Sequence, residues 1–313
     1  MAPCFAQRAL LAEGWQRQVR ITVNQAGFID SISPDSHADQ AIRFNGEVIP
    51  AIANLHSHAF QRAMAGLAEV AGDPQDSFWT WRDLMYRMVQ RLTPEQVGDI
   101  AALLYIEMLK GGYTQVAEFH YLHHDPSGAP YSDDAMLQQL IEAAEIAGIG
   151  QTMLPVLYSY SGFGSQPAAA GQKRFIQQTE HYLQQQARLD AWQQRRPLLN
   201  RGLWFHSLRA VTPGQIADVL AASDPHCPVH IHIAEQQKEV DDCVAWSGLR
   251  PLQWLHEHVQ VDPRWCLVHA THAEPHEVTA MARSGAVAGL CLTTEANLGD
   301  GGFPAVDCLA QGG

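Results

Sequence analysis

From residue 48 onward, short apolar runs rich in β-branched residues alternate with longer segments whose apolar residues recur at helical spacing. Thr93 and Pro94 mark the start of one helix, as an N-cap residue followed by proline. Repeated strand and helix patterns indicate a parallel sheet with crossover helices. Seven such units predict an α/β fold, a TIM-type (β/α)8 barrel whose eighth strand is missing from the chain. We expect strands at 48–53, 114–119, 150–157, 201–205, 228–233, 265–268 and 286–290, and further helices at 133–147, 171–191, 213–222, 249–259 and 274–283.

The first 47 residues follow a different pattern. Residues 19–23 and 28–32 alternate between apolar and polar side chains, and a turn sequence at 24–27 separates them. This pattern predicts antiparallel strands in the N-terminal part of a small β-sandwich domain. The predicted domains are therefore residues 1–47 and a barrel at 48–313.

The charge balance limits the partners of the chain. Lys and Arg number 20 against 33 acidic residues, which gives a formal net charge of −13 and argues against nucleic acid or a membrane surface as partner. The N-terminus has no signal-peptide pattern, and no apolar run is long enough to span a membrane. The six cysteines form no C-x-x-C pair and are expected to be free thiols, so we expect a cytoplasmic protein. A homodimer is an ordinary expectation for such a chain.

Histidines follow the first barrel strand. His56 and His58 are two residues apart, so on a strand both imidazoles point the same way and can bind one divalent cation. Two nearby histidines are, however, more often surface or core residues than metal ligands. Later strands also end in polar residues, and active sites of parallel barrels lie at the carboxyl ends of the strands. These residues are Glu118, His120, Tyr121, His206, Arg209, His230, His232, Glu235, His269 and His272.

A set of three histidines predicts a catalytic metal site. His56, His58 and one of His230 and His232, which share a face of their strand, would supply three nitrogens and leave coordination positions open. A metal there lowers the pKa of its bound water to about 7. Glu235 is then a candidate proton shuttle, and His269 a candidate to hold or polarise the hydroxide. The alternative is that Glu235 and His269 are solvated or structural residues.

Several motifs resemble the amidohydrolase superfamily, in its deaminase branch. They are His56-Ser57-His58, the stretch His-Ile-His-Ile-Ala-Glu at 230–235, Leu-Val-His-Ala-Thr-His at 267–272 and Thr-Thr-Glu-Ala-Asn-Leu-Gly-Asp at 293–300. Further blocks at 78–82, 117–121 and 206–213 are most similar to the family of N-formimino-L-glutamate deiminases, also called formimidoylglutamate deiminases. The resemblance covers nearly the whole chain.

The resemblance implies one zinc ion bound by His56, His58, His232 and an aspartate on the eighth strand. That strand and the C-terminal strands of the small β domain are expected to be missing from this chain. Iron or manganese would suit the same ligands. The resemblance further implies catalytic roles for Glu235 and His269. It implies substrate contacts from Gln61, Arg82, Tyr121, His206 and Arg209.

The expected reaction is hydrolysis of N-formimino-L-glutamate to N-formyl-L-glutamate and ammonia in histidine degradation. The substrate is a small dicarboxylate, and Arg82 and Arg209 would each pair with one carboxylate in a protein whose net charge repels it. The alternative for these arginines is a place on the surface. Two other functions stay open: a deaminase of the superfamily acting on guanine or cytosine, or an inactive metal-binding barrel if no aspartate follows residue 313.

Overall fold

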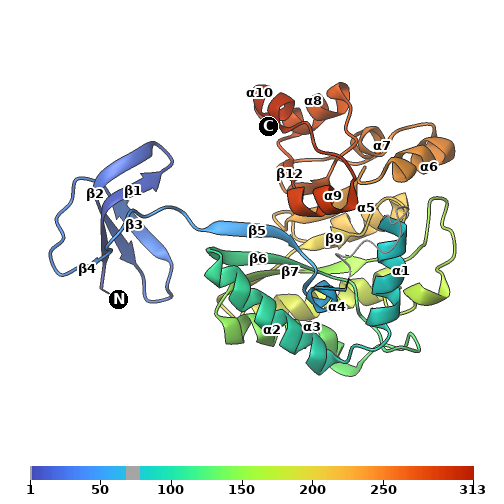
Figure 1. The fold of residues 1–313 in the computed structure, drawn as a ribbon, viewed down its shortest axis with the longest axis horizontal. Helices are drawn as coiled ribbons and strands as arrows, with labels where there is room; N and C mark the ends of the chain where they lie inside the picture. Colours follow the sequence, from blue (N-terminus) through green and yellow to red (C-terminus); the bar gives the residue numbers. More distant parts are fainter. Residues whose placement is uncertain (1, 68–77) are drawn as a thin grey trace. The chain divides into compact units, whose positions relative to one another are not determined.

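The structure is a computed structural model that describes residues 2–67 and 78–313. The chain divides into two compact units (Figure 1). One comprises Met1–Ile52 with Gly112–Thr114, and the other Ala53–Gly111 with Gln115–Gly313. The boundary between residues 47 and 48 stays a prediction.

The N-terminal unit is a four-stranded sheet in the order β3-β2-β1-β4. Its strands are β1 (Cys4–Leu11), β2 (Gly14–Val23), β3 (Ile29–Ser33) and β4 (Ile42–Arg43). Ala6, Ala9 and Val19 form its buried centre. The two predicted strands are confirmed as parts of β2 and β3. β1 was not predicted, because its buried residues do not alternate regularly with exposed ones along the strand.

The larger unit contains a parallel sheet in the order β12-β11-β10-β9-β7-β6-β5, with β8 beside β7. The prediction of a TIM-type α/β fold is confirmed, since consecutive strands are neighbours and helices connect them. The strands are β5 (Ile52–Ser57), β6 (Tyr113–His120), β7 (Gly150–Leu157), β8 (Leu199–Arg201), β9 (Leu203–Phe205), β10 (Val229–Ile233), β11 (Trp265–His269) and β12 (Val287–Gly289).

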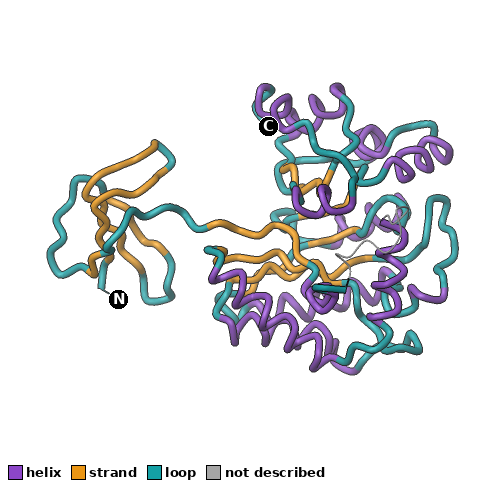
Figure 2. The backbone as a smooth tube through the Cα atoms, in the orientation of Figure 1, coloured by secondary structure: helices purple, strands orange, loops and turns teal. Residues whose placement is uncertain are grey.

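Helices connect the strands of this sheet (Figure 2), and α3 and α4 both pack on β7. The predicted N-cap of α2 is confirmed. The Thr93 hydroxyl accepts the backbone amide hydrogen of Gln96, and the Gln96 side-chain oxygen accepts the backbone amide hydrogen of Thr93. No helix in the described part of the chain could cross a membrane. The helices are α1 (Phe78–Val89), α2 (Pro94–Lys110), α3 (Ala135–Ala147), α4 (Thr179–Gln193), α5 (Pro213–Ala222), α6 (Gln237–Ser247), α7 (Pro251–His258), α8 (Pro275–Ser284), α9 (Leu292–Leu298) and α10 (Ala305–Ala310), with short 3-10 helices η1 (Ala59–Met64), η2 (Ser132–Asp134) and η3 (Ala170–Gln172).

The apolar core lies between the strands and the helices that cover them. Leu203, Ile231 and Leu267 come from three adjacent strands, and Ile216 and Val278 come from α5 and α8. All five are at most 1% exposed. Burying each such side chain stabilises the fold by about 1.5–3 kcal/mol, so this core holds the strand ends in a defined arrangement.

The helix expected at 171–191 begins only at Thr179, and two strand predictions were wrong in their limits. The first barrel strand was expected at 48–53 but begins at Ile52, because Val48 pairs with the N-terminal sheet and Pro50 has no amide hydrogen. The strand expected at 201–205 is divided into β8 and β9 at Gly202. A Cβ at Gly202 would lie 2.4 Å from a Leu154 methyl carbon and 3.1 Å from the Pro228 carbonyl oxygen, so a larger residue would require neighbouring atoms to shift.

Candidate metal centre and active site

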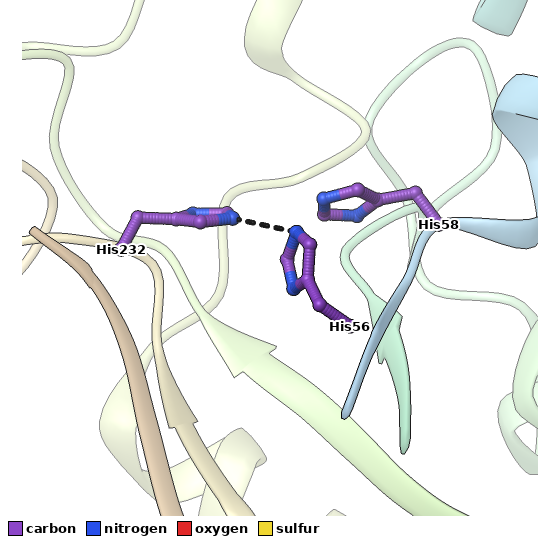
Figure 3. A group of neighbouring side chains, drawn as sticks. All are labelled: His56, His58 and His232. Carbon is purple, nitrogen blue, oxygen red and sulfur yellow. Dashed lines mark hydrogen bonds between the residues drawn. The ribbon is translucent and has the colours of Figure 1, made fainter. Parts of the chain in front are cut away.

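Three imidazoles converge inside the larger unit (Figure 3). His56 lies in β5, His58 immediately follows that strand, and His232 lies in β10. Their candidate ligand nitrogens all lie within 4.8 Å of one another, and His56 Nε2 is 3.2 Å from His232 Nε2. Two nitrogens that bind one tetrahedral zinc ion lie about 3.4 Å apart, given bonds of about 2.1 Å. The separation of His56 and His232 therefore suits a shared cation.

Backbone carbonyls determine which nitrogen is free to bind. Nδ1 of His58 lies 3.3 Å from the Phe119 carbonyl oxygen, and Nδ1 of His232 lies 3.1 Å from the His206 carbonyl oxygen. A carbonyl only accepts, so each Nδ1 carries the hydrogen and each Nε2 keeps its lone pair. Burial lowers the pKa of His58 to about 3 and also lowers the pKa values of His56 and His232. The three side chains are thus neutral nitrogen donors, and they fit a divalent metal ion.

Two aromatic rings surround these imidazoles. The Phe119 ring centroid lies 4.4 Å from that of His58 and 4.6 Å from that of His232. The Trp204 ring lies 5.2 Å from that of His56. The sequence analysis did not single out Phe119 or Trp204, although both stand in predicted strands just before polar strand ends. Their apolar surface keeps water away from the site and accounts for the burial of the imidazoles.

His269 and Glu235 form an acid–base pair beside the three imidazoles. His269 ends β11, and its ring stacks on that of His232 with centroids 5.4 Å apart. Its Nε2 lies 3.5 Å from Glu235 Oε1. Burial raises the pKa of Glu235, whereas His269 and Arg209 lower it less. Burial lowers the pKa of His269, but neighbours led by Glu235 raise it above its ordinary value. The pair can hold and transfer a proton next to the metal ligands.

Backbone strain marks the same two strand ends. Ala234, His269 and Ala270 have φ angles of 49°, 71° and 47°, in the left-handed region that residues with a Cβ rarely adopt. The Ala270 amide donates to the Ile233 carbonyl at 3.0 Å, which ties the end of β11 to that of β10. Such strain is typical of functional sites.

Glu239 holds the segment that carries Glu235. The carboxylate of Glu239, which is 2% exposed, accepts the amide hydrogens of Ala234 and Glu235, both at 3.3 Å. The sequence analysis missed this residue. Its signal is an acidic residue in the first turn of α6, where a carboxylate accepts free amide hydrogens.

Three of the predicted substrate residues lie beside the metal ligands. Gln61, in η1, donates from Nε2 to the Tyr121 hydroxyl at 3.2 Å. The Tyr121 ring lies 5.4 Å from that of His58 and 5.9 Å from that of His206. The His206 ring is 5.2 Å from that of His232. The structure therefore brings Gln61, Tyr121 and His206 together around the three imidazoles.

The two predicted arginines line one cavity of about 380 Å³. Arg82 comes from α1, with its guanidinium carbon 5.5 Å from the Tyr86 ring centroid, and Arg209 follows β9. Among the described residues, Nε of Arg209 is buried without a hydrogen-bond partner. Two guanidinium groups at one cavity suit a ligand with carboxylates. The other lining residues are Ser161, Gly162, Gln166, Gln236, Lys238, Glu239 and Asp242.

His120 and His272 are two further polar residues that the sequence analysis placed at strand ends. His120 packs its ring against that of His123, with centroids 5.3 Å apart. Within the described residues, His120 and His272 belong to neither group with metal-binding geometry. The second such group comprises His56, His269 and Cys291, whose candidate ligand atoms also lie within 4.8 Å of one another. Cys291 was not predicted, because a lone cysteine after a strand carries no spacing signal.

Comparison with known families gives two matches along the chain. The profile of the amidohydrolase family matches residues 48–313. The profile of the N-terminal domain of the formimidoylglutamate deiminase HutF matches residues 1–43. The match to the amidohydrolase family includes all the residues of the candidate site.

Individual relatives agree with these matches. The chain is 66% identical to formimidoylglutamate deiminase of Pseudomonas aeruginosa, over all of this chain and 69% of that protein. It is 27% identical to 8-oxoguanine deaminase of the same species, over 85% of this chain and 57% of that one. The crystal structure of an amidohydrolase from Brucella melitensis superposes with a TM-score of 0.94 at 47% identity, over all of this chain and 70% of that one.

Proposed function

The chain belongs to the amidohydrolase family, and on this premise we propose that it hydrolyses N-formimino-L-glutamate to N-formyl-L-glutamate and ammonia, a reaction of histidine degradation. The observation that carries the proposal is 66% identity, over the whole chain, to a formimidoylglutamate deiminase. The match of residues 1–43 to the N-terminal domain of that kind of enzyme supports it. The geometry agrees, since three neutral imidazoles lie beside an acid–base pair in a chain that also presents two arginines at one cavity.

One zinc ion is assigned to His56, His58 and His232. Nitrogen ligands and open coordination positions are typical of catalytic zinc, although iron and manganese suit the same donors. A divalent ion in this position supplies a Lewis acid that lowers the pKa of a water molecule to about 7. The tautomers set by Phe119 and His206 prepare the protein for that ion before it binds.

Arg82 and Arg209 bind the two carboxylates of the substrate. Each guanidinium offers a planar pair of N–H donors that matches one carboxylate, and these charges offset the net negative charge of the protein. Gln61, Tyr121 and His206 complete the binding surface with neutral hydrogen-bonding groups close to the metal ligands. With the substrate bound in this way, its formimino carbon would lie next to Glu235 and His269.

Glu235 and His269 move the protons of the reaction. Water adds to the formimino carbon, and His269 orients that water while Glu235 gives its proton to the imine nitrogen and takes up the proton that the water loses. The carbon–nitrogen bond to this nitrogen then breaks as Glu235 passes that proton to it and regains a proton from the new hydroxyl group, so ammonia leaves and the formyl group stays on the glutamate nitrogen. The raised pKa of Glu235 suits this role, because the side chain must carry a proton near neutral pH.

Deamination of a ring amidine is the second candidate, supported by the 27% identity to 8-oxoguanine deaminase. A neutral base needs no pair of arginines, whereas Arg82 and Arg209 line the same cavity here. The dicarboxylate is therefore the better match.

We place the reaction in the cytoplasm. All six cysteines are free thiols in the structure, as expected in a reducing compartment.

A panel of substrates tests the proposal. Full-length, zinc-loaded protein is given N-formimino-L-glutamate, N-formiminoglycine, guanine and cytosine, and ammonia release is measured. We expect the highest kcat/KM with N-formimino-L-glutamate and a large loss with N-formiminoglycine, which lacks the side-chain carboxylate. A higher kcat/KM with guanine or cytosine would overturn the assignment in favour of the second candidate.

A further inference from the structure

Glu295 lies against His269 on the side opposite Glu235. It belongs to α9 and to the motif at 293–300, for which the proposed function gives no role. Its side chain is 1% exposed, and its Oε1 lies 3.2 Å from His269 Nδ1. His269 Nε2 lies 3.5 Å from Glu235. The imidazole of His269 thus stands between two buried carboxylates, and each carboxylate faces a different ring nitrogen.

We propose that Glu295 is a positioning residue for His269, in an inference that rests on the proposed function. The Glu295 carboxylate holds the hydrogen of His269 on Nδ1 and directs Nε2 toward Glu235 and the metal ligands. An ionised carboxylate only accepts hydrogen bonds, so the nitrogen that faces it must be the donor. The bond made by Nδ1 thereby determines which ring nitrogen faces Glu235.

The backbone at His269 is strained, and the bond between His269 Nδ1 and Glu295 helps to orient the ring there. His269 and Ala270 both have φ in the left-handed region, so the strand leaves its extended course at the residue that must place the ring. The ring stacks on His232 on one face, which limits tilt but leaves the two nitrogens interchangeable by a flip. A flip would move Nδ1 toward Glu235 and break its bond to Glu295, so this bond favours the observed orientation.

A purely structural role is the competing explanation. Glu295 Oε1 also accepts the Cys291 amide hydrogen at 3.2 Å, at the start of α9. Glu295 Oε2, however, is buried without a hydrogen-bond partner among the described residues. A side-chain oxygen that accepts an amide hydrogen at a helix start does not have to be buried, so this contact does not explain the burial of the whole Glu295 carboxylate.

Glu277 provides a matched control. It is 2% exposed, lies in the first turn of α8 and accepts the amide hydrogens of Glu274 at 2.9 Å and Gln253 at 3.3 Å. Its ionic partner is Arg250, which lies outside the candidate site. Glu277→Gln therefore perturbs a buried carboxylate at a helix start without touching His269.

The test compares Glu295→Ala, Glu295→Gln and Glu277→Gln in full-length, zinc-loaded protein. Nitrogen-15 NMR of labelled histidine reports the tautomer of His269, whose signal is assigned by its loss in His269→Asn. We expect Nδ1–H in the wild type and loss of that single state in Glu295→Ala. With N-formimino-L-glutamate, kcat should fall about 10- to 100-fold in Glu295→Ala while KM changes less than about twofold. Glu295→Gln, whose amide oxygen still accepts from Nδ1, should recover most of kcat.

Two results for the Glu295 variants would overturn the proposal. An unchanged His269 tautomer and unchanged kcat in folded Glu295→Ala would overturn the proposal. Equal losses of kcat and melting temperature in Glu295→Ala and Glu277→Gln would overturn it too, because the role would then be structural. If the wild type releases no ammonia from N-formimino-L-glutamate, the proposed function fails, and the NMR comparison alone decides whether Glu295 sets the His269 tautomer.

Discussion

His120 offers a quantitative test of how burial controls protonation in this fold. The side chain ends β6, is 1% exposed and lies outside the group of three metal-binding imidazoles. Burial lowers its pKa from the ordinary 6.5 to about 3. The folded chain therefore keeps this imidazole neutral at mildly acidic pH, whereas the unfolded chain protonates it.

The sign and size of the effect follow from this difference. Below pH 6.5 the unfolded chain binds a proton at His120 that the folded chain does not bind. The free energy of unfolding therefore decreases as the pH falls from 6.5 toward 3. Each pH unit inside this window costs about 1.36 kcal/mol. Between neutral pH and pH 5, which lies 1.5 units below the ordinary value of 6.5, His120 should lower the free energy of unfolding by about 2 kcal/mol.

His120→Gln removes this titration and keeps a side chain of similar volume. We would measure the free energy of unfolding in urea at pH 7.5 and pH 5 for wild type and variant. The difference between the two proteins should change by about 2 kcal/mol in favour of the variant at the lower pH, because any fixed packing cost cancels. His226→Gln, which changes an exposed imidazole, serves as the control variant. An equal difference at both pH values for His120→Gln would refute the reasoning.

Three further substitutions test the site. His232→Ala should lower bound zinc from about one ion per chain to a small fraction, measured by elemental analysis after dialysis, since the site loses one of its three nitrogen donors; full zinc content would contradict the assignment. Arg209→Lys should lower kcat/KM for N-formimino-L-glutamate about 10- to 100-fold, because a point charge replaces a bidentate donor and a charged hydrogen bond contributes about 1.5–3 kcal/mol; an unchanged kcat/KM would remove Arg209 from the binding site. Glu239→Gln should lower the free energy of unfolding in urea by about 1–3 kcal/mol, because an amide NH₂ would face the amide hydrogen of Ala234 or Glu235; a loss below about 0.5 kcal/mol would show that this contact is weak.

The sequence predicts the fold well where local signals are strong. The strand predicted at 150–157 and the helix predicted at 213–222 match the limits of β7 and α5 to the residue. α6 was missed because its sequence is mostly polar, with Val240 and Cys243 among its few buried positions. The break at Gly202 was missed because it depends on how closely Leu154 approaches, which no local pattern records.

In the site too, residues with a local sequence pattern could be predicted, whereas residues whose partners are distant in the sequence could not. His56 and His58 could be predicted as a pair because residues two apart on a strand point the same way, whereas the choice of His232 over His230 depended on the resemblance to the amidohydrolase superfamily. Glu239 and Glu295 could not be given roles, because a single carboxylate acquires its function only from the amide or imidazole that folding brings against it. The roles of the catalytic and substrate-binding residues stay predictions until variants are measured.

The most direct test of the account is to follow both products from N-formimino-L-glutamate in one experiment. Full-length, zinc-loaded protein should release ammonia and N-formyl-L-glutamate in equal amounts. A chelator should stop the release of both products, and added zinc should restore it, since the three imidazoles act only with a bound ion. Absence of ammonia from folded, zinc-replete protein, or release of both products at an unchanged rate after zinc removal, would contradict the account.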